Sequence, residues 1–177
     1  MKSNIFKTYP LLLFIILLTI ISCKKSDIEH ENDFNKSYKS WTDFKKTSQN
    51  TYQYTVVAGT WAGYSWQTQI TVTEGKIKQR YFKYISTRDI SFIPEMEREW
   101  TEDEDKINSH QNTNAAEALT LDQIYTKARN EYLIKRENAT TIFEAKNNGL
   151  ISSCGFIDDG CQDDCFRGIT ISSIETL

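Results

Sequence analysis

The clearest alternation of apolar and polar residues runs from residue 51 to residue 85. Residues 51–58, 65–73 and 76–85 alternate with a period of two, which is typical of strands that bury one face. The central segment places four side chains on one face: Trp66, Thr68, Ile70 and Val72. The pair Glu74-Gly75 then turns the chain, because Gly75 supplies the positive φ that a tight hairpin needs. We therefore predict antiparallel strands joined at this turn.

The clearest helix is predicted for residues 119–134. Thr120 and Gln123 match a capping box, in which two otherwise unsatisfied backbone N–H groups at the start of a helix are bound. The apolar residues that follow recur at spacings of three and four, so they share one face. This face comprises Leu121, Ile124, Tyr125, Ala128 and Tyr132. Such a face is typical of a contact with the core rather than of a cofactor site.

Shorter patterns complete the fold prediction. Residues 40–52 predict a short helix that buries Trp41 and Phe44. The Asn148-Gly149 pair lies between two apolar runs and predicts a hairpin. Further strands are predicted at residues 87–93, 95–100, 139–145, 150–157 and 166–174. The predicted class is α+β, with one or two helices packed on one face of an antiparallel sheet, in a single domain over residues 40–177.

The N-terminal segment has the layout of a secretory signal. A basic start precedes an apolar run from Leu11 to Ile21, which is too short to span a bilayer as a helix. The residues up to Ser22-Cys23 resemble a bacterial lipobox, so residues 1–22 are predicted to be a lipoprotein signal peptide and Cys23 the lipidation site. The alternatives are an ordinary cleaved signal or an uncleaved anchor. Lys24 stands where enterobacterial lipoproteins kept at the inner membrane carry Asp. By this resemblance we expect a lipid-anchored position in the bacterial envelope at the outer membrane, on its periplasmic or surface face.

Composition and charge limit the classes of partner. Residues 23–39 are mostly polar and are predicted to be a flexible tether. The chain has a formal net charge of −3, and loss of Lys2 and Lys7 with the signal makes it more negative. Nucleic acid is therefore not an expected partner. A loop over residues 94–118 begins with seven acids between Glu95 and Asp105, and we interpret it as solvated or, alternatively, as a patch for a partner.

Few residues offer catalytic chemistry. The two histidines, His30 and His110, lie in the predicted tether and in the acidic loop, which leaves little for a zinc site. Ser109 neighbours His110, but adjacent residues rarely face each other as nucleophile and base. The chain contains no phosphate-binding or dinucleotide-binding glycine motif. We therefore assign no catalytic residue, expect no cofactor and favour a role without enzymatic activity.

The segment "CGFIDDGCQDDCF" concentrates cysteine and aspartate. In an exported protein, Cys154, Cys161 and Cys165 are disulfide candidates with one thiol left over, and closure of the larger loop favours a bond to Cys154. A redox pair or a zinc site is disfavoured by the spacing and by the lack of a fourth soft ligand. Four acids are weak calcium candidates, although their spacing does not match an EF-hand. They are Asp158, Asp159, Asp163 and Asp164.

Four segments together resemble a known family. The segments "TQITVTEGKI", "TLDQIYTKARNEYL", "NGLISSCGFI" and "DDCFRGITISSI", in this order, resemble domain-of-unknown-function family 6174, a group of small exported or lipid-anchored bacterial proteins. The resemblance covers residues 41–175 and implies fold and location. It carries over no catalytic residue. The cysteines around the aspartate pair and the acidic insertion at residues 94–118 depart from the family pattern.

These observations leave three functional hypotheses. The first is a lipoprotein without enzymatic activity that is held on the membrane by its N-terminal lipid and binds an unidentified envelope protein or ligand. The second is an inhibitor or immunity protein that acts against a hydrolase. The third is a calcium-binding module or a carboxylate-dependent hydrolase.

The lipid anchor can be tested by mass spectrometry of the mature protein. We expect a chain that begins at Cys23 and carries acyl chains, because two or more chains are needed for stable anchoring. A Cys23→Ser variant should leave the membrane fraction. An unacylated mature N-terminus at any other residue would contradict the prediction.

Overall fold

The structure, a computed structural model, describes residues 27–177. The predicted signal peptide and Cys23 lie outside the described residues. Within residues 27–177, no helix has the length and apolar character needed to cross a membrane.

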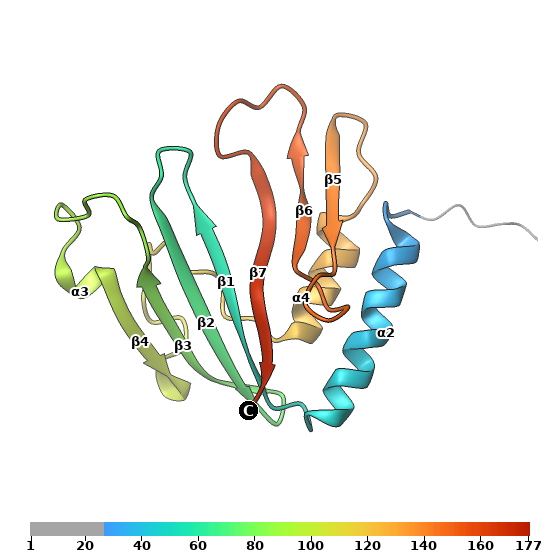
Figure 1. Ribbon diagram of the computed structural model, residues 1–177, viewed down its shortest axis with the longest axis horizontal. Coiled ribbons are helices and arrows are strands. Elements are labelled where there is room, and N and C mark those ends of the chain that lie inside the picture. The colour runs from blue at the N-terminus through green and yellow to red at the C-terminus, as the bar shows by residue number, and fades with distance from the viewer. Residues whose placement is uncertain (1–26) are drawn as a thin grey trace, which may run out of the picture.

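Seven antiparallel strands form one sheet (Figure 1). The strands are β1 (Tyr52–Gly59), β2 (Ser65–Thr73), β3 (Lys76–Tyr84), β4 (Glu99–Asp103), β5 (Ala139–Glu144), β6 (Ser153–Asp158) and β7 (Phe166–Thr176). Their order is β4-β3-β2-β1-β7-β6-β5, so the last strand lies beside the first. The pairing of β1 with β7 therefore joins an N-terminal half of the sheet to a C-terminal half.

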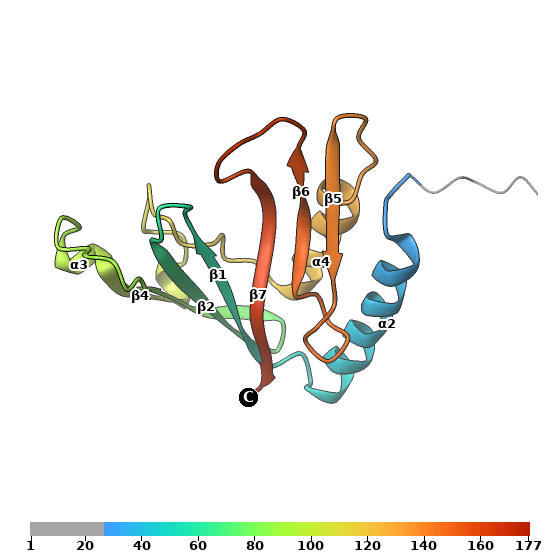
Figure 2. The same cartoon turned by 45° about the horizontal axis from the view of Figure 1, so that its top comes forward.

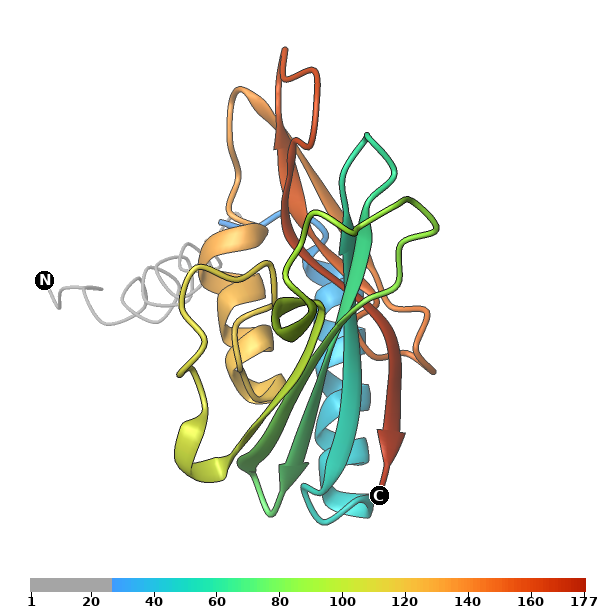
Figure 3. The same ribbon diagram turned by 90° about the vertical axis from the view of Figure 1, so that its left-hand side faces the viewer.

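The helices α2 (Glu31–Thr47) and α4 (Leu121–Lys127) pack on one face of this sheet, and the short η4 (Ala128–Tyr132) is a π-helical continuation of α4. The short α3 (Glu95–Arg98) and η3 (Glu104–Lys106) flank β4 at the edge of the sheet and bury no residue. Figure 3, which looks along the sheet from the β4 side, shows α4 against one face. Trp41 of α2 and Tyr125 of α4 lie in one buried cluster with Tyr52 and Tyr54 of β1. The predicted α+β class, with helices on one face of an antiparallel sheet, is confirmed.

The sequence patterns locate most of the core. The predicted hairpin at Glu74-Gly75 joins β2 to β3, and the alternating residues Ile70 and Val72 are fully buried. The capping box is also confirmed, because Thr120 Oγ1 accepts from the Gln123 N–H at 3.3 Å and Gln123 Oε1 accepts from the Thr120 N–H at 2.7 Å. The predicted helix is divided between α4 and the π-helical turn.

The prediction of a flexible tether over residues 23–39 is wrong for residues 31–39. Helix α2 begins at Glu31, and Phe34 and Ser37 are only 3% and 1% exposed. Ser37 Oγ lies 2.7 Å from the Tyr125 hydroxyl, which also donates to the Ser37 carbonyl. The buried residues of α2 are Phe34, Ser37 and Trp41. A serine does not appear as a core residue in a hydropathy pattern.

The predicted strand pair beside Pro94 also differs from the structure. Residues 87–93 form turns, and the strand β4 begins at Glu99 after the single helical turn of α3. The acidic segment 94–118 is therefore not one loop. Trp100 and Glu102 of β4 point inward, opposite Phe82 and Arg80 of β3.

Phe34→Ala tests whether residues 31–39 belong to the domain. We expect a loss of about 3–5 kcal/mol in the free energy of unfolding, because a buried aromatic ring is removed. Asn35→Ala, at an exposed position of the same helix, should have little effect. Urea denaturation compares the two variants, and equal stabilities would support a tether at this position.

Candidate functional site

The strands β1 and β7 pair at one end and separate at the other. Their register runs from Tyr52↔Thr176 to Thr55↔Ser173 and then shifts, so that Val56 pairs with Ile171. Ser172 is therefore the extra residue of a β-bulge, a feature that bends a strand and increases its twist. No pair between the two strands is formed beyond Val56 within the described chain. Figures 1 and 2 show the strands diverging toward the β1–β2 and β6–β7 connections.

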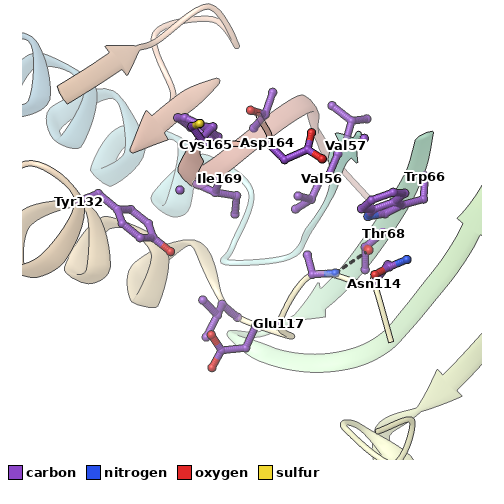
Figure 4. A pocket seen from close by; sticks show the side chains of 17 residues that line it. Val56, Val57, Trp66, Thr68, Asn114, Glu117, Tyr132, Asp164, Cys165 and Ile169 are labelled. Carbon is purple, nitrogen blue, oxygen red and sulfur yellow. Dashed lines mark hydrogen bonds between the residues drawn. The ribbon is translucent and has the colours of Figure 1, made fainter. Parts of the chain in front are cut away.

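A cleft of about 450 Å³ lies where the two strands diverge. This volume falls within the range of small-ligand sites. The end of β1, the start of β7, the loop before α4 and η4 form its walls (Figure 4). Its side chains include Val56, Val57, Trp66, Thr68, Asn114, Glu117, Leu119, Tyr132, Asp164, Phe166 and Ile169.

The interior of the cleft combines aromatic and aliphatic side chains with polar groups. Trp66, Val56 and Ile169 come from three neighbouring strands, and Tyr132 approaches from η4. The polar side chains beside them already have partners. Thr68 Oγ1 accepts from the Ala116 N–H at 2.9 Å. A cavity that combines aromatic and aliphatic side chains with polar groups is typical of a ligand site.

The loop that forms one wall of the cleft is held by a buried arginine. Arg80 is 4% exposed, and its Nε donates to the Ala116 carbonyl at 2.9 Å. One terminal nitrogen donates to the Ala115 carbonyl at 3.3 Å, and the other to Glu102 Oε2 at 3.2 Å. Arg80 therefore joins the backbone of this loop to the carboxylate of Glu102.

Glu102 completes this network from β4. It is 1% exposed and accepts hydrogen bonds from the N–H groups of Asn108 at 2.8 Å and His110 at 2.6 Å. Burial alone raises the pKa of its carboxyl, but these hydrogen bonds and the Arg80 guanidinium outweigh burial and hold the pKa below its usual value. Glu102 is therefore an ionised anchor for the loop.

The interpretation of the acidic run as solvated is therefore wrong for Glu102. The sequence signal that locates this residue is its register, because Glu102 lies directly opposite Arg80 and two residues after the inward-facing Trp100. Charge composition does not predict this ion pair, because Glu102 can be matched with Arg80 only when the pairing of their strands is known.

Ser109 and His110 also serve the loop. Ser109 Oγ donates to Glu102 Oε1 at 3.2 Å. The His110 ring stacks on Trp100 with centroids 4.1 Å apart, and its Nδ1 lies 3.5 Å from Glu102 Oε1. His30 lies elsewhere, with Nε2 3.1 Å from the Thr141 carbonyl oxygen. The residues that a catalytic triad would use are thus engaged in holding the loop.

The disulfide joins Cys161 to Cys165, with their Cα atoms 5.9 Å apart. The expected bond to Cys154 is wrong, because Cys154 lies inside β6, faces the core and is completely buried. Burial raises the pKa of its thiol to about 12, so this thiol stays protonated and unreactive. The disulfide instead closes the exposed β6–β7 loop, and Cys165 reaches the cleft.

The four calcium candidates do not converge. Asp158 forms an ion pair with Arg167 at 3.1 Å, and Asp164 Oδ1 accepts from the Trp61 N–H at 2.8 Å. Asp159 and Asp163 are exposed. Within residues 27–177, no three His, Cys, Asp or Glu side chains are arranged to hold a metal ion. Asp164 instead connects the disulfide loop to the tip of the β1–β2 hairpin, at the mouth of the cleft.

A second hollow of about 660 Å³ lies beyond Asn114, beside β3 and β4. Its aromatic walls stack on one another, with centroids 5.2 Å apart for Phe82 and Trp100. Trp100 also stacks on His110 of the loop, and Asn114 of this loop lines both hollows.

Comparison of the chain with family models, with curated proteins and with solved structures gives no match. The fold and the site define an α+β protein with a cleft between β1 and β7, in the middle of its sheet. The resemblance to domain-of-unknown-function family 6174 stays a prediction from its four quoted segments.

Arg80→Met tests the anchor of the cleft wall. We expect a loss of about 3–5 kcal/mol in the free energy of unfolding, because Glu102 is left buried without its counter-charge. The matched control is Lys78→Met on the same strand. Lys78 forms an exposed ion pair with Glu104 at 2.6 Å, and its loss should cost under about 1 kcal/mol. Urea denaturation measures the loss in the free energy of unfolding for each variant. Equal losses would contradict a stabilising role of the buried pair.

Proposed function

We propose that this protein is a membrane-anchored lipoprotein of the bacterial envelope, and that it binds another envelope component in the cleft between β1 and β7. The observation that carries the binding role is the cleft with aromatic and aliphatic walls at the point where strand pairing stops. The lipobox-like residues before Cys23 support the anchor. The acidic composition supports an envelope partner rather than a nucleic acid.

The chain between a lipid on Cys23 and the folded domain is shorter than a tether over residues 23–39 would make it. Ile28 is buried and forms a β-bridge with Ile134, so the folded domain begins shortly after Cys23. The four residue steps from Cys23 to Asp27 reach at most about 14 Å when fully extended. A lipid on Cys23 would therefore hold the domain close to the membrane surface, within reach of other envelope components at that surface.

A carboxylate-dependent hydrolase is a second candidate, because Glu117 and Asp164 both line the cleft. Glu117 Oε2 accepts from Lys127 at 3.0 Å, and Asp164 accepts from the Trp61 backbone. An acid–base pair requires one carboxyl that gives up a proton and one that takes it. The existing partners of both groups favour a binding role over this one.

Binding in the cleft can be tested with the uncharged apolar dye N-phenyl-1-naphthylamine. We expect saturable fluorescence enhancement, because the dye moves from water into an apolar site. Trp66→Ala should weaken the binding of the dye by roughly tenfold, since it removes an aromatic wall.

Gln67→Ala is the matched control, because Gln67 follows Trp66 on β2 and points to the opposite face of the sheet. Circular dichroism establishes that both variants are folded. A lack of saturable binding by the wild type, or equal binding by the two variants, would contradict binding in the cleft.

A further inference from the structure

We infer that the ligand of this cleft is an extended peptide segment that carries basic side chains and pairs its backbone with the open edges of β1 and β7. This inference rests on the proposed function and specifies the chemical class of the ligand.

The edge of β1 faces the cleft with unpaired backbone groups. In an antiparallel sheet, successive residues direct their N–H and C=O groups alternately to the two neighbouring strands. Thr60 donates to the Tyr64 carbonyl at 2.8 Å, on the β2 side. Val57 and Gly59 therefore direct their backbone groups to the β7 side, where the described chain provides no strand partner beyond Val56.

The edge of β7 presents the complementary groups. The Ile171 N–H donates to the Ser152 carbonyl at 2.8 Å, on the β6 side. By the same alternation, Gly168 and Thr170 direct their backbone groups toward β1. Both residues line the cleft, and the register of residues 27–177 gives them no partner on this side. Two open strand edges thus face one cavity.

These edges lack the features that protect other strand edges. Exposed edges are commonly protected by charged residues, and β4 carries Glu99 and Asp103 at the rim of the sheet. In contrast, β1 ends in "VVAG" at Val56–Gly59, and this segment carries no charged side chain. Edges of this kind accept an added strand, which is a recurring mode of peptide recognition.

The charge around the cleft selects among peptides. The described lining includes the carboxylates of Glu117 and Asp164, and no Lys, Arg or His belongs to it. Lys127 pairs with Glu117, so among the described residues Asp164 is the lining carboxylate that no ion pair neutralises. Complementarity therefore favours a segment in which basic residues alternate with apolar residues that contact the aromatic floor.

The test uses three hexapeptides with blocked ends in competition with N-phenyl-1-naphthylamine. The first alternates Val and Lys, the second replaces Lys with Glu, and the third is the Val–Lys peptide with alternate backbone nitrogens methylated, made in both registers. We expect the first to displace the dye. One methylated register should bind roughly tenfold more weakly, because it loses backbone hydrogen bonds.

Protein variants test the same inference. Asp164→Asn keeps an oxygen for the Trp61 N–H but removes a charge, and it should weaken binding of the Val–Lys peptide roughly threefold. Asp159→Asn, at an exposed position of the same loop outside the cleft lining, is the control and should have no effect.

The outcomes separate the two proposals. If the dye binds but both methylated registers, or the Glu peptide, compete as well as the parent, the ligand class is wrong and binding in the cleft stands. If the dye binds and no peptide displaces it, the ligand is not an extended basic segment. If the dye itself does not bind, the proposed function fails, and this inference fails with it.

Discussion

The buried ion pair between Arg80 and Glu102 is the contact on which the cleft depends. Burial of two charges is costly unless both are fully hydrogen-bonded. Here the guanidinium binds two backbone carbonyls as well as the carboxylate, and the carboxylate accepts two backbone N–H groups. Arg80 also lies over the Trp100 ring, 5.2 Å from its centroid. The pair therefore holds a long irregular loop against the sheet, and this loop is one wall of the cleft.

The second constraint is the way the two halves of the sheet are joined. At one end β1 and β7 are paired, and α2 bridges the halves because Phe34 contacts Phe143 of β5 while Trp41 contacts Tyr52 of β1. At the other end the bulge at Ser172 shifts the register, and the pairing of β1 with β7 stops at Val56 and Ile171. The cleft lies between the paired end and the disulfide loop, where Asp164 binds the tip of the β1–β2 hairpin.

Several elements follow from local patterns. The hairpin at Glu74-Gly75 and the capping box at Thr120 appear as predicted, because a turn and a helix start depend on neighbouring residues. The part of the site on β2 follows too, since alternation places Trp66 and Thr68 on the buried face. Residues whose burial depends on distant partners do not follow from these patterns. Ser37 is buried by a hydrogen bond to Tyr125, and Glu102 by a charge on the opposite strand.

Local patterns in the sequence predict the α+β class, the main hairpins, the capped helix and the buried faces of β1 and β2. These properties arise from interactions within a few residues and from a period of two or 3.6. The pairing of the last strand with the first, the position of the bulge and the burial of Cys154 are visible only in the folded chain. Those features depend on contacts between residues far apart in the chain, so the cleft and its open strand edges could not be read from the sequence alone.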